Sequence, residues 1–535
     1  MAVLFAQVGS TLKLIDPDAG TSQDLTLPTG VTIDSTRVPS MATLALGAAI
    51  VYSPSRNLLL TSSKTLIPLV PITPSSAASV AATGSGVLNG GYKVAISFLI
   101  KDADGNVLTE SPMTALSSVA ALSNQQLAIT SIPTSTEASV NARRIYRTLS
   151  GGSILYFLAD IDNNTTTTYT DNTADATLSI LPTTDHETSG PPGALTTDAY
   201  TLRLVVSWKN RLWGCSNETA ALDDILFTED GTVYKWTGSI TAYPKGQELN
   251  GVIALAPRRD QLGVLKRGGL WQITGDSEAN FRIVQLAYGK GGCVSRRTVV
   301  TVNDTVYWLG PDGVYEWGSS GVRSITDDSV QPWFLTSTYF NRDQFQNAFA
   351  KYNPLRNQYE LHLAPTGAST FTQWIAYNLT NKAWYGPHLT TETDYTCAAS
   401  TETAEGIPKT LVAGSNGTFY TYSPTTYHDG TTTAISVDVE TPFFSGNAPD
   451  IEHYWGELSM LTKVEAAGTL TITPTVGRLD ASAGTAISHT LTTGREVLRR
   501  LGIGALMKLR FQHSTVDRSV TIYGVEVPFH EVGKR

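Results

Sequence analysis

Charged side chains are scarce in this chain of 535 residues: they make up 16% of it, against about 25% in an average soluble protein. Acidic residues outnumber basic ones by 47 to 38, so the net charge is −9. A protein that grips nucleic acid through its phosphates needs a basic surface. The composition therefore argues against that class, but it allows a surface past which nucleic acid slides without binding.

Cysteines and long apolar runs are also few. Cys215, Cys293 and Cys397 lie far apart and are odd in number, which excludes a disulfide framework and the spacing of a zinc site and favours synthesis in a reducing cytosol. The longest apolar run, 41–52, spans 12 residues, whereas a membrane helix needs about 20. Residues 1–7 lack the basic segment of a signal peptide. We therefore predict no signal peptide and no membrane-spanning segment.

Helical periodicity is nearly absent, and the best helical candidate, 343–350, is short. Strand patterns are frequent instead: residues 507–512 alternate strictly between apolar and polar, which places the apolar set on one face. Similar alternation runs through 92–100, 469–476 and 520–527. The 45 Gly and 25 Pro suit tight turns, and 22 Tyr, 15 Phe and 10 Trp supply core area. The sequence predicts an all-β protein.

A degenerate repeat occupies the middle of the chain, in which a turn containing Gly is followed at once by aromatic residues. This is the hairpin signature. Its glycines, Gly231, Gly269, Gly313 and Gly417, are separated by 38, 44 and 104 residues, and the last gap has room for two units. A period of about 40 to 45 residues matches one four-stranded propeller blade.

A second echo extends this array to the start of the chain. Residues 52–57 (Tyr-Ser-Pro-Ser-Arg-Asn) resemble 352–357 (Tyr-Asn-Pro-Leu-Arg-Asn), and both segments precede an apolar strand. Proline, whose φ is already restricted, makes each segment a turn between strands. We therefore assign residues 1–75 and 194–430 to one β-propeller-like array.

The segment between these two parts, 76–193, is predicted to be an insertion. It begins in a Pro, Ser and Ala-rich linker at 71–86 and ends in a second linker, 188–193. Short strands in between, with a turn at 104–106, are typical of an immunoglobulin or fibronectin-like β-sandwich. From residue 431 the repeat gives way to long alternating strands, which predict a C-terminal β-sandwich over 431–535.

Catalytic motifs are missing from the sequence. It has no Gly-x-Ser-x-Gly elbow, no phosphate-binding Gly-rich loop before a helix and no His-Glu-x-x-His pair. The eight histidines are scattered singly, among them His362, His388, His428 and His513. We predict that the chain is not an enzyme, with no catalytic residues, no cofactor-binding residues, no metal ligands and no cofactor.

A polysaccharide-cleaving enzyme is the sharpest alternative. Residues 228–236 resemble the Asp-box of sialidases, but Asp230 and Gly231 are adjacent where the box has an intervening residue, and the box is a structural turn. A glycosidase needs two carboxyl groups within about 5 to 10 Å. The sequence has two adjacent acidic pairs, Asp223 with Asp224 and Asp327 with Asp328. They would supply these carboxyl groups only if folding oriented the side chains suitably, and we favour their interpretation as solvated turn residues.

Three further groups have a structural and a functional interpretation. Asp102, Asp104 and Asn106 have the alternate spacing of a calcium loop but lack the later ligands, so a hairpin turn is favoured. The aromatic residues of the repeat are interpreted as core, with a sugar-binding platform as the alternative: Trp271, Trp317 and Tyr420. A basic cluster is interpreted as a solvated or intersubunit face, with nucleic acid or an acidic partner as the alternative: Arg495, Arg499, Arg500, Lys508 and Arg510.

The predicted order of domains resembles that of the tail nozzle (tail tubular, or hub) proteins of short-tailed bacteriophages. This order is a propeller start, a fibronectin-like insert, a propeller continuation and a terminal sandwich. Four groups of residues carry the resemblance: 142–147 with 156–159 and 169–171; 209–213 with 225–228 and Trp236; 310–315; and 507–511 with 522–527.

The resemblance implies a virion structural protein of the tail, synthesised in the host cytoplasm. It implies a homohexameric ring below the portal and the head-to-tail adaptor protein, through which genomic DNA passes without sequence-specific binding, and docking sites for tail fibres. An acidic wall would repel phosphate, so we expect more Asp and Glu than Lys and Arg along the assembled lumen. The alternatives are a receptor-binding tail protein and a polysaccharide-cleaving tailspike.

Overall fold

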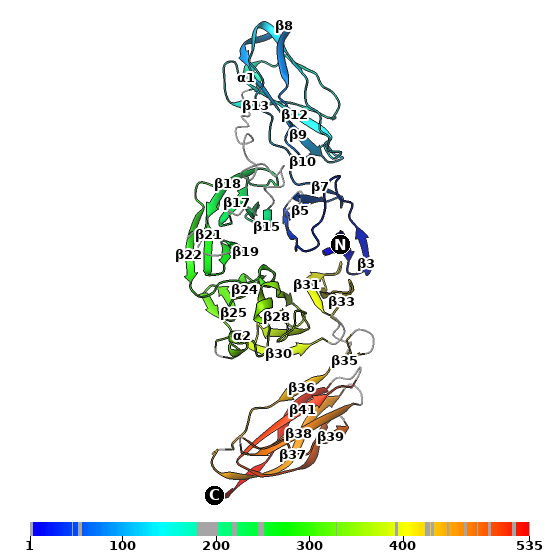
Figure 1. Ribbon diagram of the computed structural model, residues 1–535, viewed down its shortest axis with the longest axis vertical. Coiled ribbons are helices and arrows are strands. Elements are labelled where there is room, and N and C mark those ends of the chain that lie inside the picture. Colours follow the sequence, from blue (N-terminus) through cyan, green and yellow to red (C-terminus); the bar gives the residue numbers. More distant parts are fainter. Residues whose placement is uncertain are drawn as a thin grey trace. The chain divides into compact units, whose positions relative to one another are not determined.

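The computed structural model (Figure 1) describes residues 4–44, 47–51, 56–178, 202–216, 222–243, 251–327, 329–390, 394–422, 428–429, 433–446, 449–464, 468–478, 480–490, 494–515 and 520–533. Strands are by far the commonest regular element among these residues, as the period-two patterns predict. The chain divides into two compact units: Met1–Pro387 with Cys397–Thr410, and His388–Thr396 with Leu411–Arg535. The fold is all-β: a propeller-like array with an inserted β-sandwich and a C-terminal β-sandwich.

Seven small sheets make up the propeller within the described ranges. Five of them have four strands and the first and last have three. Their strands are β1 (Leu4–Val8), β2 (Thr11–Asp16), β3 (Thr21–Asp24); β4 (Ser40–Leu44), β5 (Gly47–Val51), β6 (Leu58–Thr61), β7 (Leu66–Pro68); β15 (Leu202–Trp208), β16 (Arg211–Ser216), β17 (Asp224–Thr228), β18 (Trp236–Thr241); β19 (Val252–Pro257), β20 (Leu262–Lys266), β21 (Gly269–Thr274), β22 (Arg282–Tyr288); β23 (Val300–Val302), β24 (Thr305–Leu309), β25 (Val314–Gly318), β26 (Gly321–Ser324); β27 (Phe349–Asn353), β28 (Gln358–Leu363), β29 (Gln373–Asn378), β30 (Ala383–Leu389); and β31 (Tyr395–Glu402), β32 (Pro408–Gly414), β33 (Phe419–Thr421).

Neighbouring sheets of the propeller share buried apolar cores, because each strand presents one apolar face to the next sheet. The third and fourth sheets, for example, enclose Trp213 between Leu204 and Val264. The first sheet also meets the end of the array: the backbone N–H of Ala404 donates to Asp18 Oδ2 at 3.0 Å, and Lys409 Nζ donates to the carbonyl of Pro17. Residues 1–75 therefore belong to the same ring of sheets as the later repeats.

The glycine repeat does not mark the same turn in every sheet of the propeller. The turns before Gly269, Val314 and Phe419 join the second and third strands of their sheets, whereas the Gly231 turn joins the third and fourth strands, β17 and β18. Gly231 adopts φ +73° and Gly417 φ +79°, which only glycine adopts easily. The sheet β27–β30 fills the 104-residue gap between Gly313 and Gly417. Turn chemistry is local, so it marks a hairpin without specifying which one.

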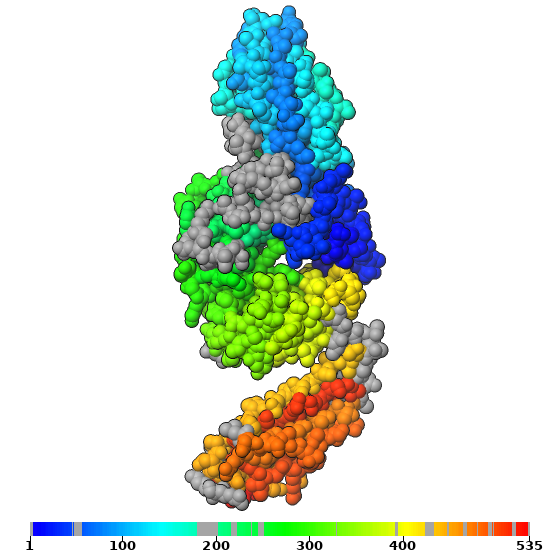
Figure 2. All heavy atoms as spheres, in the orientation of Figure 1, coloured from blue at the N-terminus to red at the C-terminus, as the bar shows by residue number. Residues whose placement is uncertain are grey.

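The insert is a sandwich of two sheets, β10-β9-β12-β13 and β14-β11-β8, around an apolar core. The predicted linker 71–86 is wrong in its second half, because β8 already begins at Ser79 and pairs with β11 over its length. Figure 2 shows β8 as a continuous blue band on the surface of the insert. The predicted linker at 188–193 lies outside the described residues. The elements are β8 (Ser79–Tyr92), β9 (Val94–Lys101), β10 (Val107–Glu110), β11 (Ala120–Thr130), β12 (Ala142–Thr148), β13 (Leu155–Ile161), β14 (Tyr169–Asp171) and α1 (Asp175–Leu178).

The C-terminal sandwich has two sheets, β36-β41-β38-β39 and β40-β37-β42, and β43 also pairs with β37. The apolar residues of the alternating run at 507–511 face its core, as predicted: Met507, Leu509 and Phe511 are buried. Its strands, with the short pair that precedes them, are β34 (His428–Asp429), β35 (Thr433–Ala434), β36 (Val437–Glu440), β37 (Glu452–Val464), β38 (Thr469–Gly477), β39 (Ile487–Thr490), β40 (Gly494–Gly504), β41 (Leu506–His513), β42 (Val520–Glu526) and β43 (Phe529–Gly533).

Helices are short wherever the structure describes them. The predicted helix at 343–350 is instead the 3-10 helix η4 (Arg342–Asn347), followed at once by β27. Asn341 caps it by accepting a hydrogen bond from the Asp343 N–H. The others are α1 in the insert, η3 (Arg296–Thr298) and α2 (Pro332–Leu335). None of the described helices has the length and hydrophobicity that a bilayer crossing requires.

Candidate functional site

The four histidines singled out in the sequence belong to four different strands, β28, β30, β34 and β41. His362 is buried and its ring stacks on Phe349, with 4.6 Å between centroids. Burial, with the charges of Lys351 and Arg297, holds the pKa of His362 well below its usual value. His513 is also buried, and its Nδ1 lies 2.9 Å from the carbonyl oxygen of Thr469. His388 is half-buried in β30, and the side chain of His428 lies outside the described residues.

Asp223 and Asp224, the acidic pair whose two residues are both described, are held by different partners. Asp223 is buried and forms an ion pair with Lys266 at 2.9 Å, whereas Asp224 accepts a hydrogen bond from the Thr241 hydroxyl. Asp327 accepts a hydrogen bond from Gln331 Nε2 at 3.1 Å, and Asp328 lies outside the described residues. Within the described ranges, no group of three or more His, Cys, Asp or Glu side chains is placed to hold a metal ion.

Asp102, Asp104 and Asn106 lie in the turn between β9 and β10, which agrees with the hairpin-turn interpretation of these residues. Asp102 Oδ1 accepts the backbone N–H groups of Asp104 at 3.0 Å and Asn106 at 2.8 Å, and its Oδ2 accepts the Asn106 side chain at 3.0 Å. The side-chain hydrogen bond from Asn106 is the largest of several that lower the pKa of Asp102. Its oxygens therefore hold the turn together.

The basic cluster of the C-terminal sandwich is paired within the chain. Arg495 contacts Glu526 at 2.5 Å, Arg500 contacts Glu457 at 3.4 Å, and Lys508 contacts Glu440 at 2.8 Å. Arg510 pairs with Asp438, while Arg499 donates to the carbonyl of Thr485. These pairs neutralise most of the cluster, so it is a weak attractor for phosphate. Trp271 and Trp317 are buried between sheets, and Tyr420 is half-buried.

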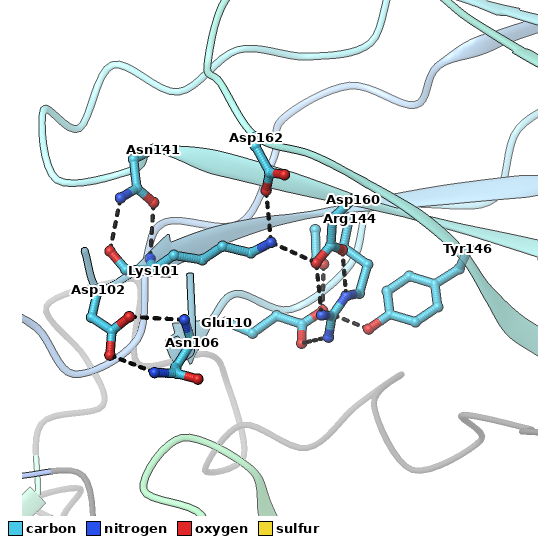
Figure 3. A network of polar contacts seen from close by, with 10 residues as sticks. Lys101, Asp102, Asn106, Glu110, Asn141, Arg144, Tyr146, Asp160 and Asp162 are labelled. Atoms are coloured by element: carbon cyan, nitrogen blue, oxygen red, sulfur yellow. Dashed lines mark hydrogen bonds and ion pairs between the residues drawn. The ribbon is translucent and has the colours of Figure 1, made fainter. Parts of the chain in front are cut away.

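A charged network that the sequence did not predict lies at one end of the inserted sandwich (Figure 3). Arg144 lies between two carboxylates, contacting Glu110 at 3.1 Å and Asp160 at 2.8 Å. Lys101 extends the network from Asp160, at 2.8 Å, to Asp162, at 2.7 Å. Arginine presents a planar fork of donors, which suits it to this bridging position.

The second oxygen of Glu110 is satisfied as well. The hydroxyls of Ser97 and Tyr146 both donate to Glu110 Oε1 at 2.5 Å. Burial opposes the charge of Arg144, but the hydrogen bonds to Asp160 and the charge of Glu110 outweigh it and raise the pKa of Arg144. Burial, with the Glu110 charge, also raises the pKa of Tyr146, which keeps its hydroxyl a donor. Groups paired in this way make the surrounding part of the insert rigid.

The same end of the insert is fastened to the propeller. Arg56, which precedes β6, forms an ion pair with Glu137 of the insert and donates to the carbonyl of Val70 at 2.9 Å. The Thr109 hydroxyl donates to the carbonyl of Leu69 at 2.8 Å. One apolar cluster also contains side chains from both parts: Phe98, Ile100, Leu108 and Val140 of the insert with Leu69, Val70, Leu226, Val233 and Trp236.

Arg296 links three sheets of the ring. It lies in η3, which leads into the fifth sheet. Its Nη1 donates to the carbonyl of Arg203 in β15 at 2.5 Å, and its Nη2 donates to the carbonyl of Val38, which precedes β4. Burial, with the charges of Arg297 and Arg203, lowers the pKa of Arg296 to about 10. One guanidinium group thus connects the second, third and fifth sheets of the propeller.

The sequence contained one signal for the network at the base of the insert. Arg143, Arg144 and Arg147 alternate around Ile145 and Tyr146, so arginines fall on both faces of β12, and Arg143 and Arg147 are fully buried. Buried guanidinium groups require acceptors. The sequence does not reveal which residues act as acceptors. The acceptors of Arg144, Glu110 and Asp160, lie 34 and 16 residues away from it along the chain. Arg296 carried no comparable signal, since its acceptors are backbone carbonyls.

No protein-family model matches the chain, and no curated protein matches it. Among solved structures it is similar to PorZ, an essential bacterial surface component of the type-IX secretion system of Porphyromonas gingivalis, with 10% identity, a TM-score of 0.29, and coverage of 99% of this chain and 80% of that one. It is also similar to virginiamycin B lyase from Staphylococcus aureus (13%, 0.25, 56% and 80%) and to exo-β-1,3-galactanase from Phanerochaete chrysosporium (12%, 0.20, 74% and 95%). Likenesses of this size assign no function.

Proposed function

We propose that the chain is a structural subunit of the tail nozzle of a short-tailed bacteriophage, and that six copies form a ring. The ring is a conduit for genomic DNA between the head-to-tail adaptor protein and the exterior, and a platform for tail fibres. The proposal rests on the order of domains and on the residue patterns that resemble this family.

One observation carries the proposal on the physical side: the insert is fixed to the propeller by an ion pair, a hydrogen bond from a side chain to a backbone carbonyl, and a shared apolar core. Arg56 and Glu137 make the ion pair, and Thr109 reaches the carbonyl of Leu69. A subunit that bears load in a ring must keep its parts in register, and a packed interface resists relative motion better than a flexible linker. The Glu110 network stiffens the insert beside this junction.

The conduit of this proposal lies between subunits. Arg296 joins three sheets of the propeller. In this proposal each propeller therefore forms part of the wall of the ring, and the axis of a single propeller is not the channel for a DNA duplex. Closed rings use heterologous interfaces, in which two different surfaces of each copy meet. The net charge of −9 suits a lumen with more Asp and Glu than Lys and Arg, past which phosphate moves without binding.

Native mass spectrometry and cryo-electron microscopy of the purified chain, alone and with the adaptor protein, test the proposal. We expect a ring of six that binds the adaptor at one end and has an acidic lumen. A stable trimer would favour a tailspike. A monomer that remains a monomer in the presence of the adaptor, or a lumen rich in Lys and Arg, would contradict the proposal.

A further inference from the structure

Two adjoining cavities follow the seam between β22 and β26, the outermost strands of the fourth and fifth sheets. Their volumes are about 300 and 220 Å³, and Leu286 and Val322 line both. β22 lies on the outer rim of the propeller (Figure 1). Together the cavities form one groove with the dimensions of a small-molecule site.

The smaller cavity contains two carboxylates that neighbouring side chains hold in place. The Tyr315 hydroxyl donates to Asp312 Oδ1 at 2.8 Å, and Gln331 Nε2 donates to Asp327 Oδ1 at 3.1 Å. Burial and the hydrogen bond to Asp312 raise the pKa of Tyr315, so its hydroxyl stays a donor. Each carboxylate keeps a second oxygen as an acceptor. Acceptors fixed in this way bind a ligand without first having to be ordered.

The centre of the groove is apolar. Leu286 is 39% exposed on β22, and Val322 is half-buried opposite it on β26. The groove therefore alternates an aliphatic floor with polar ends, one formed by Asp312 and Asp327 and the other lined by Gln272 and Ser319. Sugar rings have matching surfaces, with C–H groups on their faces and hydroxyls at their edges.

The charges in the groove favour a neutral ligand over an anionic one. Two carboxylates repel a phosphate or an anionic sugar, and two of the three cations that line the groove are already paired, Arg323 with Glu316 and Arg258 with Asp304. Lys290 contributes one ammonium group, so the site has donors as well as acceptors. We propose that this seam binds a neutral oligosaccharide of about two rings, in which Asp312 and Asp327 accept hydrogen bonds from ring hydroxyls. This inference goes beyond the conduit function and does not depend on it.

An array of immobilised bacterial O-antigen and capsular polysaccharides, probed with the fluorescently labelled full chain, tests the proposal. We expect binding to at least one neutral glycan. The variants Asp327→Ala and Gln331→Ala should each weaken it at least tenfold. Glu405→Ala, which removes an exposed carboxylate from the β31–β32 turn, is the matched control and should leave binding unchanged.

Leu286→Arg provides a second test that keeps every hydrogen-bonding group of the groove. It should block both cavities and abolish binding, whereas Leu389→Arg, which alters a leucine on β30 that is 64% exposed, should not. An array without signal for the natural chain, or binding that survives Leu286→Arg, would overturn the proposal. So would a peptide ligand that is lost with Leu286→Arg while the glycan array stays blank. Ring assembly is measured on the same samples, which separates this outcome from the conduit function.

Discussion

Arg147 and Asp171 form a fully buried ion pair that joins the two sheets of the inserted sandwich. Arg147 lies on β12 and Asp171 on β14, and both side chains are 0% exposed. The same guanidinium group also contacts Asp175 at 2.8 Å and lies over the ring of Tyr92. All these groups come from separate elements, so the pair holds the insert in one arrangement.

Breaking this pair should destabilise the insert strongly. Asp171→Ala removes the fully buried one of the two carboxylates that pair with Arg147. Because Asp175 remains, the loss should be at most that of an uncompensated buried charge, about 3 to 5 kcal/mol. Hydrogen exchange in the full chain measures this free energy at the β12 amides, and at the β40 amides for the control variant. Arg495→Met, which breaks an ion pair with 64% and 67% exposed partners, is the control and should cost less than about 1 kcal/mol. Equal effects of the two variants would contradict the assignment.

The three cysteines should differ in reactivity. Burial raises the pKa of Cys215 and of Cys293 to about 12, so almost no thiolate is present at pH 8. Cys397 is exposed. Titration of the purified native chain with Ellman's reagent at pH 8 should therefore modify one thiol quickly, and three after denaturation. Rapid reaction of all three in the native state would show that the buried positions are wrong.

His362 should make the chain less stable in mild acid. Its pKa is lowered in the folded state and is about 6.5 in the unfolded state, so the unfolded chain binds an extra proton below pH 6.5. Stability should therefore fall as pH drops below that value, by up to about 1.4 kcal/mol per pH unit. Thermal unfolding between pH 7.5 and 5 measures this slope. His362→Phe keeps the ring stacked on Phe349 and should reduce the slope, and an unchanged slope would refute the prediction.

Arg296→Met should loosen the propeller. The substitution removes two charged donors from the carbonyls of Arg203 and Val38, and hydrogen bonds of this kind contribute about 1.5 to 3 kcal/mol each. It also relieves the repulsion from Arg297 and Arg203, which offsets part of the loss. We expect a net loss of about 1 to 3 kcal/mol, measured as faster hydrogen exchange in β4 and β15. Arg282→Met, at an exposed position of β22, should leave this exchange unchanged.

Much of the fold could be predicted from nearest-neighbour patterns. The alternation at 507–512 corresponds to β41, and that at 469–476 to β38. The Gly-rich segment 79–86 was misjudged as a linker because its small, exposed residues have no local pattern of burial. Its strand character depends on pairing with β11, for example between Ser79 and Thr130. The hydrogen bonds of β8 are therefore made with a strand distant in sequence, and the local sequence of β8 does not predict them.

The charged residues show where prediction from sequence ends. Arg495 was one of five apparently clustered cations, but its partner Glu526 lies 31 residues away. Nothing in the sequence indicates that the carboxylates of Asp312 and Asp327 lie close together, yet both line one cavity beside Tyr315. Electrostatic character depends on the distance between groups in space, which the spacing of residues along a β-rich chain does not reveal.

Short strands and glycine-containing turns follow from the order of residues, because strand faces and turn geometry depend on residues only a few positions apart. The folded chain is needed to know which sheets are neighbours, which carboxylate pairs with each arginine, and that Leu286 and Val322 line a common groove. Those relations arise when the ring of sheets closes and brings together residues as distant as Val38 and Arg296, which are 258 positions apart.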